Sequence, residues 1–226
     1  MSDLIITART LKSLVDPVLP LAGRDDMMPV LTAVQVCVDG EWLTATATDR
    51  FVMGHKRIKG DWPKGWEALI PVTVLRTILR TYKPQRGDDP ELTLGIADGS
   101  LTVSSSGGFA DFLGAQTTYR LQDGEFPGVL KVVQDLLDVE PAPGVPAFNP
   151  AFLGRFAAAG ADTAALHYYA PSPAKPMLVT DGETFWGAIM TCRNVGESAT
   201  NATTLRHLLA PITAKPKPAR TRKKAS

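Results

Sequence analysis

The sequence predicts an α+β protein made of repeated strand-helix-strand-strand-strand units. Three observations carry this prediction. Apolar residues alternate with polar ones on both sides of Asp39-Gly40 and of Asp98-Gly99, and Asp-Gly between such runs is a strong hairpin signal. A helical apolar pattern precedes each of these turns, and a third Asp-Gly follows at Asp181-Gly182. The recurrence indicates about three copies of one unit.

The first unit is predicted from the spacing of its apolar residues. Leu11, Leu14 and Val18 lie at helical spacing, and Pro17 and Pro20 are expected to fray the end of that helix. Between residues 42 and 48, threonine alternates with alanine as a half-buried strand requires. The expected elements are a strand at 4–6, a helix at 9–21 and strands at 30–38, 42–48 and 51–58. Asp49, at the end of a strand, is expected to cap the following turn rather than to act as a base.

The second unit repeats the same order. Val74, Leu75 and Ile78 form the apolar face of its helix, and the hairpin turns at Asp98-Gly99. The expected elements are a strand at 69–72, a helix at 73–83 and strands at 92–96, 101–105 and 112–119.

A third copy follows a Pro-rich stretch at 140–146, whose composition marks a boundary. Asn149 is expected to cap a helix that Pro150 begins. The expected elements are a helix at 150–159 and strands at 163–169, 177–180 and 184–191. The predicted organisation is a domain at 1–133, a connector at 134–146, a partial domain at 147–195 and a basic tail at 196–226.

The charge of the chain is uneven. The formal net charge is +1, yet the stretch after Thr213 carries six Lys or Arg and no Asp or Glu, so the rest is mildly acidic. Alternation of Pro, Ala and Lys in this tail predicts disorder. Two interpretations of the tail stay open: a solubilising end, or an arm that binds phosphates without reading sequence.

Several function classes are disfavoured by what the sequence lacks. Cys37 and Cys192 have no spacing typical of disulfide frameworks or zinc sites. The chain shows no phosphate-binding loop, no metalloprotease or serine-hydrolase motif, and three scattered histidines. We therefore expect a noncatalytic binding protein without a cofactor. No apolar run approaches the roughly 18 residues that a membrane helix needs, which predicts a cytoplasmic protein that does not bind membranes.

Five stretches resemble, in the same order, parts of the bacterial DNA polymerase III beta subunit, the DNA sliding clamp, in its actinobacterial form. They are 47–53 (Ala-Thr-Asp-Arg-Phe-Val-Met), 123–133, 147–153, 174–178 and 188–193. Residues 1–133 look like the middle domain of that family, and 147–195 look like the second half of its last domain. The resemblance implies a shortened, phage-like or reduced DNA clamp fold of one full domain and a half domain.

The resemblance also implies a function. A sliding clamp is a processivity factor in DNA replication that binds double-stranded DNA without sequence specificity and tethers a replicative DNA polymerase through a peptide-binding pocket. Its expected partners are DNA, polymerase, a clamp loader and further copies of itself in a homo-oligomeric ring, near the nucleoid. Two alternatives stay open: a clamp-derived adaptor or decoy that does not encircle DNA, and a hydrolytic enzyme on an unrelated α+β fold.

Helical spacing places Arg76, Arg80 and Lys83 on one face of the second helix, where they form a candidate phosphate-binding stripe. A solvated charged helix face is the alternative interpretation. The resemblance adds cations on the other two helices and in one loop that touches DNA in the family. The additional residues are Arg9, Lys12, Arg24 and Arg155.

The resemblance further implies a pocket for short linear peptides between the middle and last domains. Methionines give such a pocket deformable apolar walls, and a basic rim anchors a peptide carboxylate. The alternative is that these are ordinary core and strand-end residues. The predicted pocket residues are Leu31, Thr48, Arg50, Met53, Pro127, Lys131, Val132, Ala188, Met190, Cys192 and Arg193. Thr191 and Asn194 depart from the usual motif of the family, so a pocket shape and partner preference different from those of the family are expected.

Overall fold

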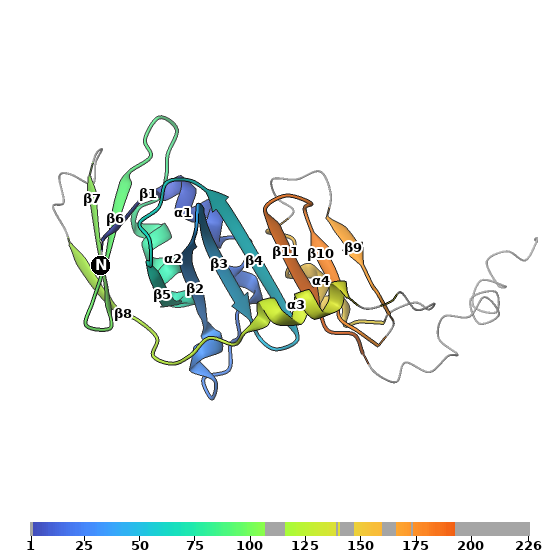
Figure 1. Ribbon diagram of the computed structural model, residues 1–226. Helices are drawn as coiled ribbons and strands as arrows, with labels where there is room; N and C mark the ends of the chain where they lie inside the picture. The colour runs from blue at the N-terminus through green and yellow to red at the C-terminus, as the bar shows by residue number, and fades with distance from the viewer. Residues whose placement is uncertain are drawn as a thin grey trace, which may run out of the picture.

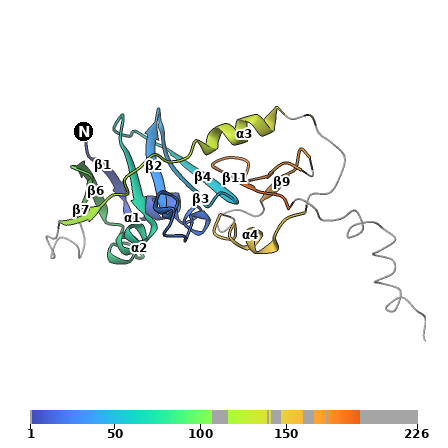
Figure 2. The same ribbon diagram turned by 90° about the horizontal axis from the view of Figure 1, so that it is seen from below.

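The computed structural model describes residues 2–106, 116–138, 140, 147–159, 166–172 and 174–192 (Figure 1). Their strands form two antiparallel sheets, one of four strands and one of seven. Helices α1, α2 and α4 lie on one side of the strands, and helix α3 lies on the other (Figure 2). The arrangement is of the α+β class, as the sequence predicts.

The first unit consists of β1 (Leu4–Thr7), α1 (Ala8–Val15), β2 (Ala33–Asp39), β3 (Trp42–Thr48) and β4 (Val52–Lys59). The Thr7 side chain caps α1 by accepting a hydrogen bond from the Thr10 N–H, at 3.2 Å. The helix ends six residues earlier than predicted, before Pro17, and a 3-10 turn at Leu19–Leu21 replaces its last part. A second 3-10 turn at Pro29–Thr32 likewise delays the start of β2.

The second unit consists of β5 (Glu67–Pro71), α2 (Val72–Thr81), β6 (Glu91–Ala97), β7 (Ser100–Ser106) and β8 (Thr117–Arg120). The first strands of the two units are exchanged. β1 pairs with β6 of the second unit, and β5 pairs with β2 of the first. This exchange interlocks the two units around one core. Residues 112–115 of the predicted last strand lie outside the described residues.

The third unit consists of α4 (Pro150–Gly154), β9 (His167–Tyr169), β10 (Met177–Thr180) and β11 (Phe185–Ile189). The predicted Asn149 cap is confirmed, since its side chain accepts from the Ala151 N–H at 3.0 Å. The helix is shorter than predicted and gives way to turns after Gly154. Residues 163–165 of the predicted strand 163–169 lie outside the described residues.

β11 pairs with β4, so the third unit extends the sheet of the first. The resulting order is β5-β2-β3-β4-β11-β10-β9. Gly54 and Gly187 face each other at this joint, and a Cβ at Gly187 would collide with the Met53 carbonyl and the ring of Phe156. Glycine is therefore required there, because the two units approach each other closely.

A single apolar core runs through all three units and includes Leu14, Leu75, Leu94, Phe156 and Phe185. The rings of Phe156 and Phe185 meet edge to face, with centroids 6.1 Å apart, which packs the turns that follow α4 against β11. Among the described residues, no helix combines the length and apolarity that spanning a bilayer demands.

Helix α3 (Val129–Leu137) was not predicted from the sequence. It covers residues that the prediction divided between the first domain and the connector, so the predicted boundary at 133/134 falls inside a helix. Its Leu136 is buried, whereas Val132 and Leu137 are exposed. The helix crosses the sheet near β4 and β11, on the face opposite α1 and α2 (Figure 2).

Candidate functional site

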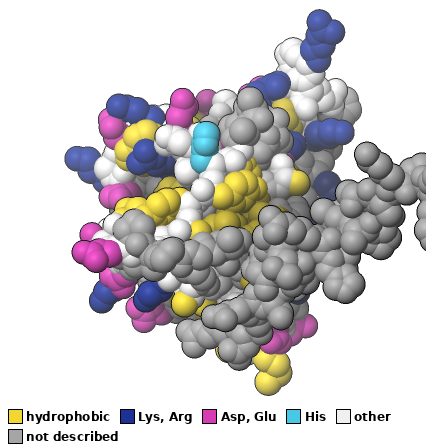
Figure 3. Space-filling model, turned by 90° about the vertical axis from the view of Figure 1, so that its right-hand side faces the viewer, with side chains coloured by type: hydrophobic (Ala, Val, Ile, Leu, Met, Phe, Trp, Pro, Cys, Tyr) yellow, Lys and Arg dark blue, Asp and Glu magenta, His cyan; other side chains and the backbone are white. Residues whose placement is uncertain are grey.

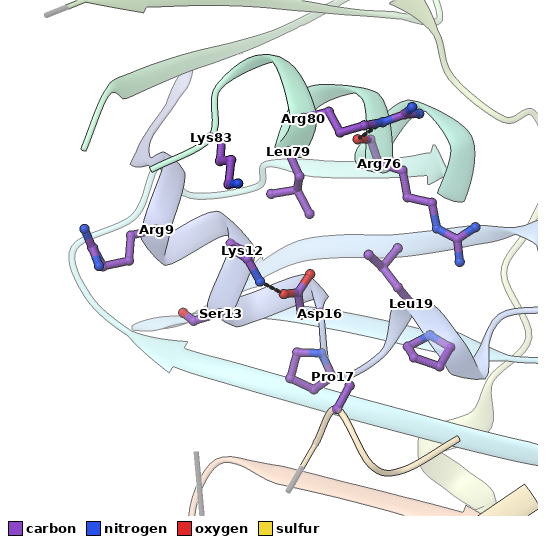
Figure 4. A pocket seen from close by; sticks show the side chains of 12 residues that line it. Arg9, Lys12, Ser13, Asp16, Pro17, Leu19, Arg76, Leu79, Arg80 and Lys83 are labelled. Carbon is purple, nitrogen blue, oxygen red and sulfur yellow. Dashed lines mark hydrogen bonds and ion pairs between the residues drawn. The ribbon is translucent and has the colours of Figure 1, made fainter. Parts of the chain in front are cut away.

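The helix side of the molecule holds an open groove of about 870 Å³ between α1 and α2, which we call the cationic groove (Figure 4). Leu19, Leu79, Pro17 and Pro20 form its apolar base. Its lining includes five of the predicted DNA-contacting residues: Arg9, Lys12, Arg76, Arg80 and Lys83. The structure thus brings together cations that are about 70 residues apart in the sequence.

The two helices differ in how their cations are paired. On α1, Arg9 lies 3.5 Å from a carboxylate oxygen of Asp89, and Lys12 pairs with Asp16 one turn later. On α2, the Arg80 Nε donates to the Arg76 carbonyl at 3.4 Å. Within the described residues, neither arginine of α2 nor Lys83 has a carboxylate at ion-pair distance. Arg76 and Arg80 of α2, and Lys83 two residues beyond the end of that helix, which was predicted to include it, are called the α2 cations. Their charge is the one available to an anion.

Arg155, also predicted to contact DNA, is engaged by contacts within the protein. Its guanidinium donates to the Pro20 carbonyl at 2.6 Å and to the Ala22 carbonyl at 3.1 Å, and it pairs with Asp49. The side chain is only 20% exposed. Its N–H donors hold the end of α4 against the first unit. The guanidinium therefore has no free pair of N–H groups with which to bind a phosphate.

On the opposite face, an apolar pocket of about 220 Å³ lies between β4, β11 and α3. The structure brings seven of the predicted pocket residues together there: Thr48, Arg50, Met53, Pro127, Val132, Ala188 and Met190. Met53 is opposite Ala188 in the β4–β11 register, and the Met190 N–H donates to the Phe51 carbonyl at 2.8 Å. The joint between the first and third units therefore builds the pocket.

The remaining predicted pocket residues lie elsewhere. Leu31 lines a neighbouring groove with Arg24, Lys131 is exposed on α3, and Cys192 is exposed beyond β11. Arg193 lies outside the described residues. The structure adds Phe51, Val52, Val129 and Pro176 to the lining. All four lie in the stretches that carry the family resemblance, so the resemblance was the signal that could have identified them. Whether their side chains face the pocket depends on α3 and on the β3–β4 turn.

The β3–β4 turn that borders the pocket is held by two side chains. The Asp49 Oδ1 accepts from the N–H groups of Phe51 and Val52 at 2.8 and 2.9 Å. The Thr48 hydroxyl accepts from the Arg50 N–H at 3.1 Å and donates to the Val52 carbonyl at 2.8 Å. These bonds hold Arg50 at a φ of +80°, a conformation rare outside glycine. The predicted turn-capping role of Asp49 is confirmed.

His55 lies on the same sheet face as Met53, farther along β4. It is 7% exposed, its Nδ1 is 2.9 Å from the Thr46 hydroxyl, and its ring stacks on Trp186 of β11 at 4.7 Å. Burial, and secondarily the positive charge of Arg57, lower the pKa of His55 from 6.5 to about 4. The histidine is therefore a neutral part of the β4–β11 joint at neutral pH.

The joint has a second polar anchor in Lys56 and Asp181, whose charged atoms are 3.5 Å apart. Burial raises the pKa of Asp181. Hydrogen bonds from the backbone of Phe185, Glu183 and Thr184, and from the Thr184 hydroxyl, outweigh this effect and lower the pKa to about 2. The carboxylate is thus charged at neutral pH and fixes the β10–β11 turn beside β4.

Comparison with known proteins gives three findings. Residues 5–128 match the family described as DNA polymerase III beta subunit, central domain. The beta sliding clamp of Micrococcus luteus is 35% identical over 112 residues, which are 48% of this chain and 33% of that protein. The beta sliding clamp of Streptomyces coelicolor is 33% identical over 123 residues, which are 51% of this chain and 30% of that protein. The match spans about a third of these relatives.

Solved structures share the fold at lower identity. A putative DNA polymerase III beta subunit from Eubacterium rectale superposes with a TM-score of 0.69 and 14% identity, over 85% of this chain and 66% of that one. The DNA polymerase III beta subunit of Thermotoga maritima gives a TM-score of 0.68 and 14% identity, over 85% and 66%. The likeness therefore extends beyond residue 128 into the third unit.

Proposed function

Because this chain belongs to the DNA polymerase III beta subunit family, whose members are noncatalytic polymerase subunits, we propose that it is a DNA sliding clamp or a reduced form of one. In this proposal the cationic groove holds double-stranded DNA through its phosphates, without reading sequence. The apolar pocket holds short peptides of a replicative polymerase and other replication proteins. The protein then raises processivity by keeping the polymerase at high effective concentration near DNA.

The observation that carries the proposal is the position of the two sites on opposite faces of one sheet. Residues of α1 and α2 line the cationic groove, and residues of α3 line the apolar pocket. These helices lie on opposite sides of the strands (Figure 2). Neither the cations of α2 nor the methionines of the pocket are shared between the two sites. DNA and peptide are therefore expected to bind at the same time.

A ring is the proposed way of holding DNA, and it requires further copies of this chain. In this proposal the third unit is a half domain. Its outer strand β9 has three exposed residues. Hydrophobic side chains gather on this end of the molecule (Figure 3). Exposed strand edges next to apolar surface are usually covered by a partner. The competing proposal is an adaptor that keeps the peptide pocket and does not encircle DNA, and the half domain favours that alternative if no self-association occurs.

The test of the proposal measures both sites in one experiment. Labelled duplex DNA and a labelled Gln-Leu-rich peptide are titrated with the protein, separately and together, and light scattering gives the mass in solution. Sequence-independent DNA binding that a saturating peptide leaves unchanged supports the proposal. Competition between DNA and peptide, or no DNA binding at low salt, contradicts it. If the protein binds DNA and peptide while its own mass stays at that of one chain, 24.2 kDa, the adaptor becomes the favoured proposal.

A further inference from the structure

A second groove of about 400 Å³, which we call the loop groove, lies next to the apolar pocket. The 23–31 loop forms one wall through Arg24, Met28 and Leu31, and the β3–β4 turn forms the other through Arg50 and Phe51. Arg50 and Phe51 also line the apolar pocket. A ligand that fills the apolar pocket can therefore continue past these two residues into the loop groove without leaving the protein surface.

The shared wall is rigid. The Asp49 and Thr48 bonds described above fix the backbone on both sides of Arg50. The Phe51 ring is 52% exposed, yet it stacks on Phe152 of α4 with centroids 6.0 Å apart. Because this stacking fixes the exposed ring of Phe51, the ring offers a preorganised surface to a peptide ligand.

The charged side chains of the loop groove differ in whether they are free to contact a ligand. Its two carboxylates are engaged by the protein: the Asp25 Oδ1 accepts from the Met27 N–H at 3.0 Å, and Asp49 holds the turn and pairs with Arg155. The side chains of Arg24 and Arg50 are exposed and have no hydrogen-bond or ion-pair partner among the described residues. The groove therefore offers two guanidinium groups to an incoming anion.

We propose that the loop groove binds an acidic segment of the same peptide whose apolar residues fill the apolar pocket. The guanidinium groups of Arg24 and Arg50 contact the carboxylates of this segment, and Met28 packs beside its backbone. This inference rests on the proposed function of the apolar pocket. It also assigns Arg24 to the peptide, whereas the sequence resemblance assigned Arg24 to DNA.

The structure favours the peptide over DNA as the partner of Arg24. Arg24 does not line the cationic groove, and its groove shares two residues with the apolar pocket. A contact between Arg24 and duplex DNA is the competing outcome of the test. The two outcomes differ in which ligand loses affinity when the charge at residue 24 is reversed.

The experiment compares two synthetic peptides with the same Gln-Leu-rich core, one flanked on both sides by Asp and Glu and the other by Ser and Gly. Their affinities are measured for the wild type, for Arg24→Glu and for Arg86→Glu. Arg86 is an exposed cation in the turn after α2 and outside all three grooves, so Arg86→Glu is a matched control. The affinity of each protein for duplex DNA is measured in parallel.

The inference predicts that the acidic flanks tighten binding to the wild type about five- to tenfold at low salt, and that high salt removes most of this gain. Arg24→Glu abolishes the gain, keeps the affinity for the Ser-Gly peptide and keeps DNA binding, and Arg86→Glu changes none of these. Equal affinity of the wild type for both peptides overturns the inference but not the pocket. Binding of neither peptide overturns the pocket itself. Loss of DNA binding in Arg24→Glu, with the flank effect intact, assigns Arg24 to DNA.

Discussion

Arg155 of the third unit forms an ion pair with Asp49 of the first, and each side chain is about four-fifths shielded from solvent. Through the same guanidinium, Arg155 also bonds the carbonyl oxygens of Pro20 and Ala22. Asp49 at the same time caps the turn that presents Arg50 and Phe51. One contact thus couples the attachment of the third unit to the geometry of the apolar pocket.

Replacement of this arginine by methionine, Arg155→Met, is expected to lower the free energy of unfolding by about 2–4 kcal/mol, because it leaves a part-buried carboxylate and two carbonyls without their donor. Urea unfolding followed by circular dichroism measures the change. Arg86→Met, at an exposed turn, is the control and should change stability by less than about 0.5 kcal/mol. An equal effect of the two substitutions would contradict the structural role of Arg155.

Stability is expected to fall between pH 6.5 and about 4 because of His55. The folded-state pKa is depressed to about 4, so in this window the unfolded chain binds a proton that the folded chain excludes. The contribution of this group is fully present above pH 6.5, and about 3 kcal/mol of it is lost by pH 4. Other carboxylates add their own pH dependence, so the measurement is the difference between the wild type and His55→Phe. A difference that does not vary with pH would show that His55 titrates normally.

The apolar pocket is tested most cleanly at Met190, which is 38% exposed and follows β11. Met190→Ala is expected to weaken the Gln-Leu-rich peptide by tenfold or more, because buried apolar anchors dominate peptide affinity. Met53→Ala should do the same but also cost about 2–5 kcal/mol of stability, because Met53 is only 5% exposed. Leu137→Ala, which removes an exposed side chain of α3 outside the pocket, is the control. Full peptide affinity in folded Met190→Ala would refute the pocket.

The Lys12–Asp16 pair is expected to restrain DNA binding. Asp16 lines the cationic groove, so it both neutralises Lys12 and repels phosphates. Asp16→Asn should therefore tighten duplex DNA binding about two- to fivefold at 0.1 M salt, a gain typical of an exposed charge pair. Asp98→Asn makes the same charge change in the β6–β7 turn and should leave DNA affinity unchanged. Equal affinities of the two variants would mean that Asp16 does not face the DNA.

The repeated unit could be predicted from the sequence because its signals are local. Hairpin turns such as Asp39-Gly40 and helical spacing such as that of Arg76 and Arg80 depend on neighbouring residues alone. The exchange of β1 and β5 between units could not be predicted, since the pairing of Leu4 with Leu94 is a long-range contact that no local pattern encodes.

The candidate site was predicted in part for the same reason. The cations of α1 and α2 follow from helical spacing and family resemblance. The internal contacts of Arg155 could not be predicted, because a charged residue beside a short helix has the same sequence signature whether it faces solvent or a carbonyl. Helix α3 was not predicted, because the neighbouring Pro-rich stretch indicates a connector, and the pocket wall at Val129 was missed with it.

The claim that the cationic groove holds DNA through the α2 cations is tested most directly by the salt dependence of duplex DNA binding. Arg76→Glu with Arg80→Glu should weaken binding to every sequence and flatten the slope of log affinity against log salt by about 0.9 for each phosphate that the variant no longer neutralises. The matched control is Arg86→Glu with Arg120→Glu, which makes the same charge change outside the groove. A flatter slope in the α2 variant alone is the predicted result, and an unchanged slope and affinity in that variant would contradict it.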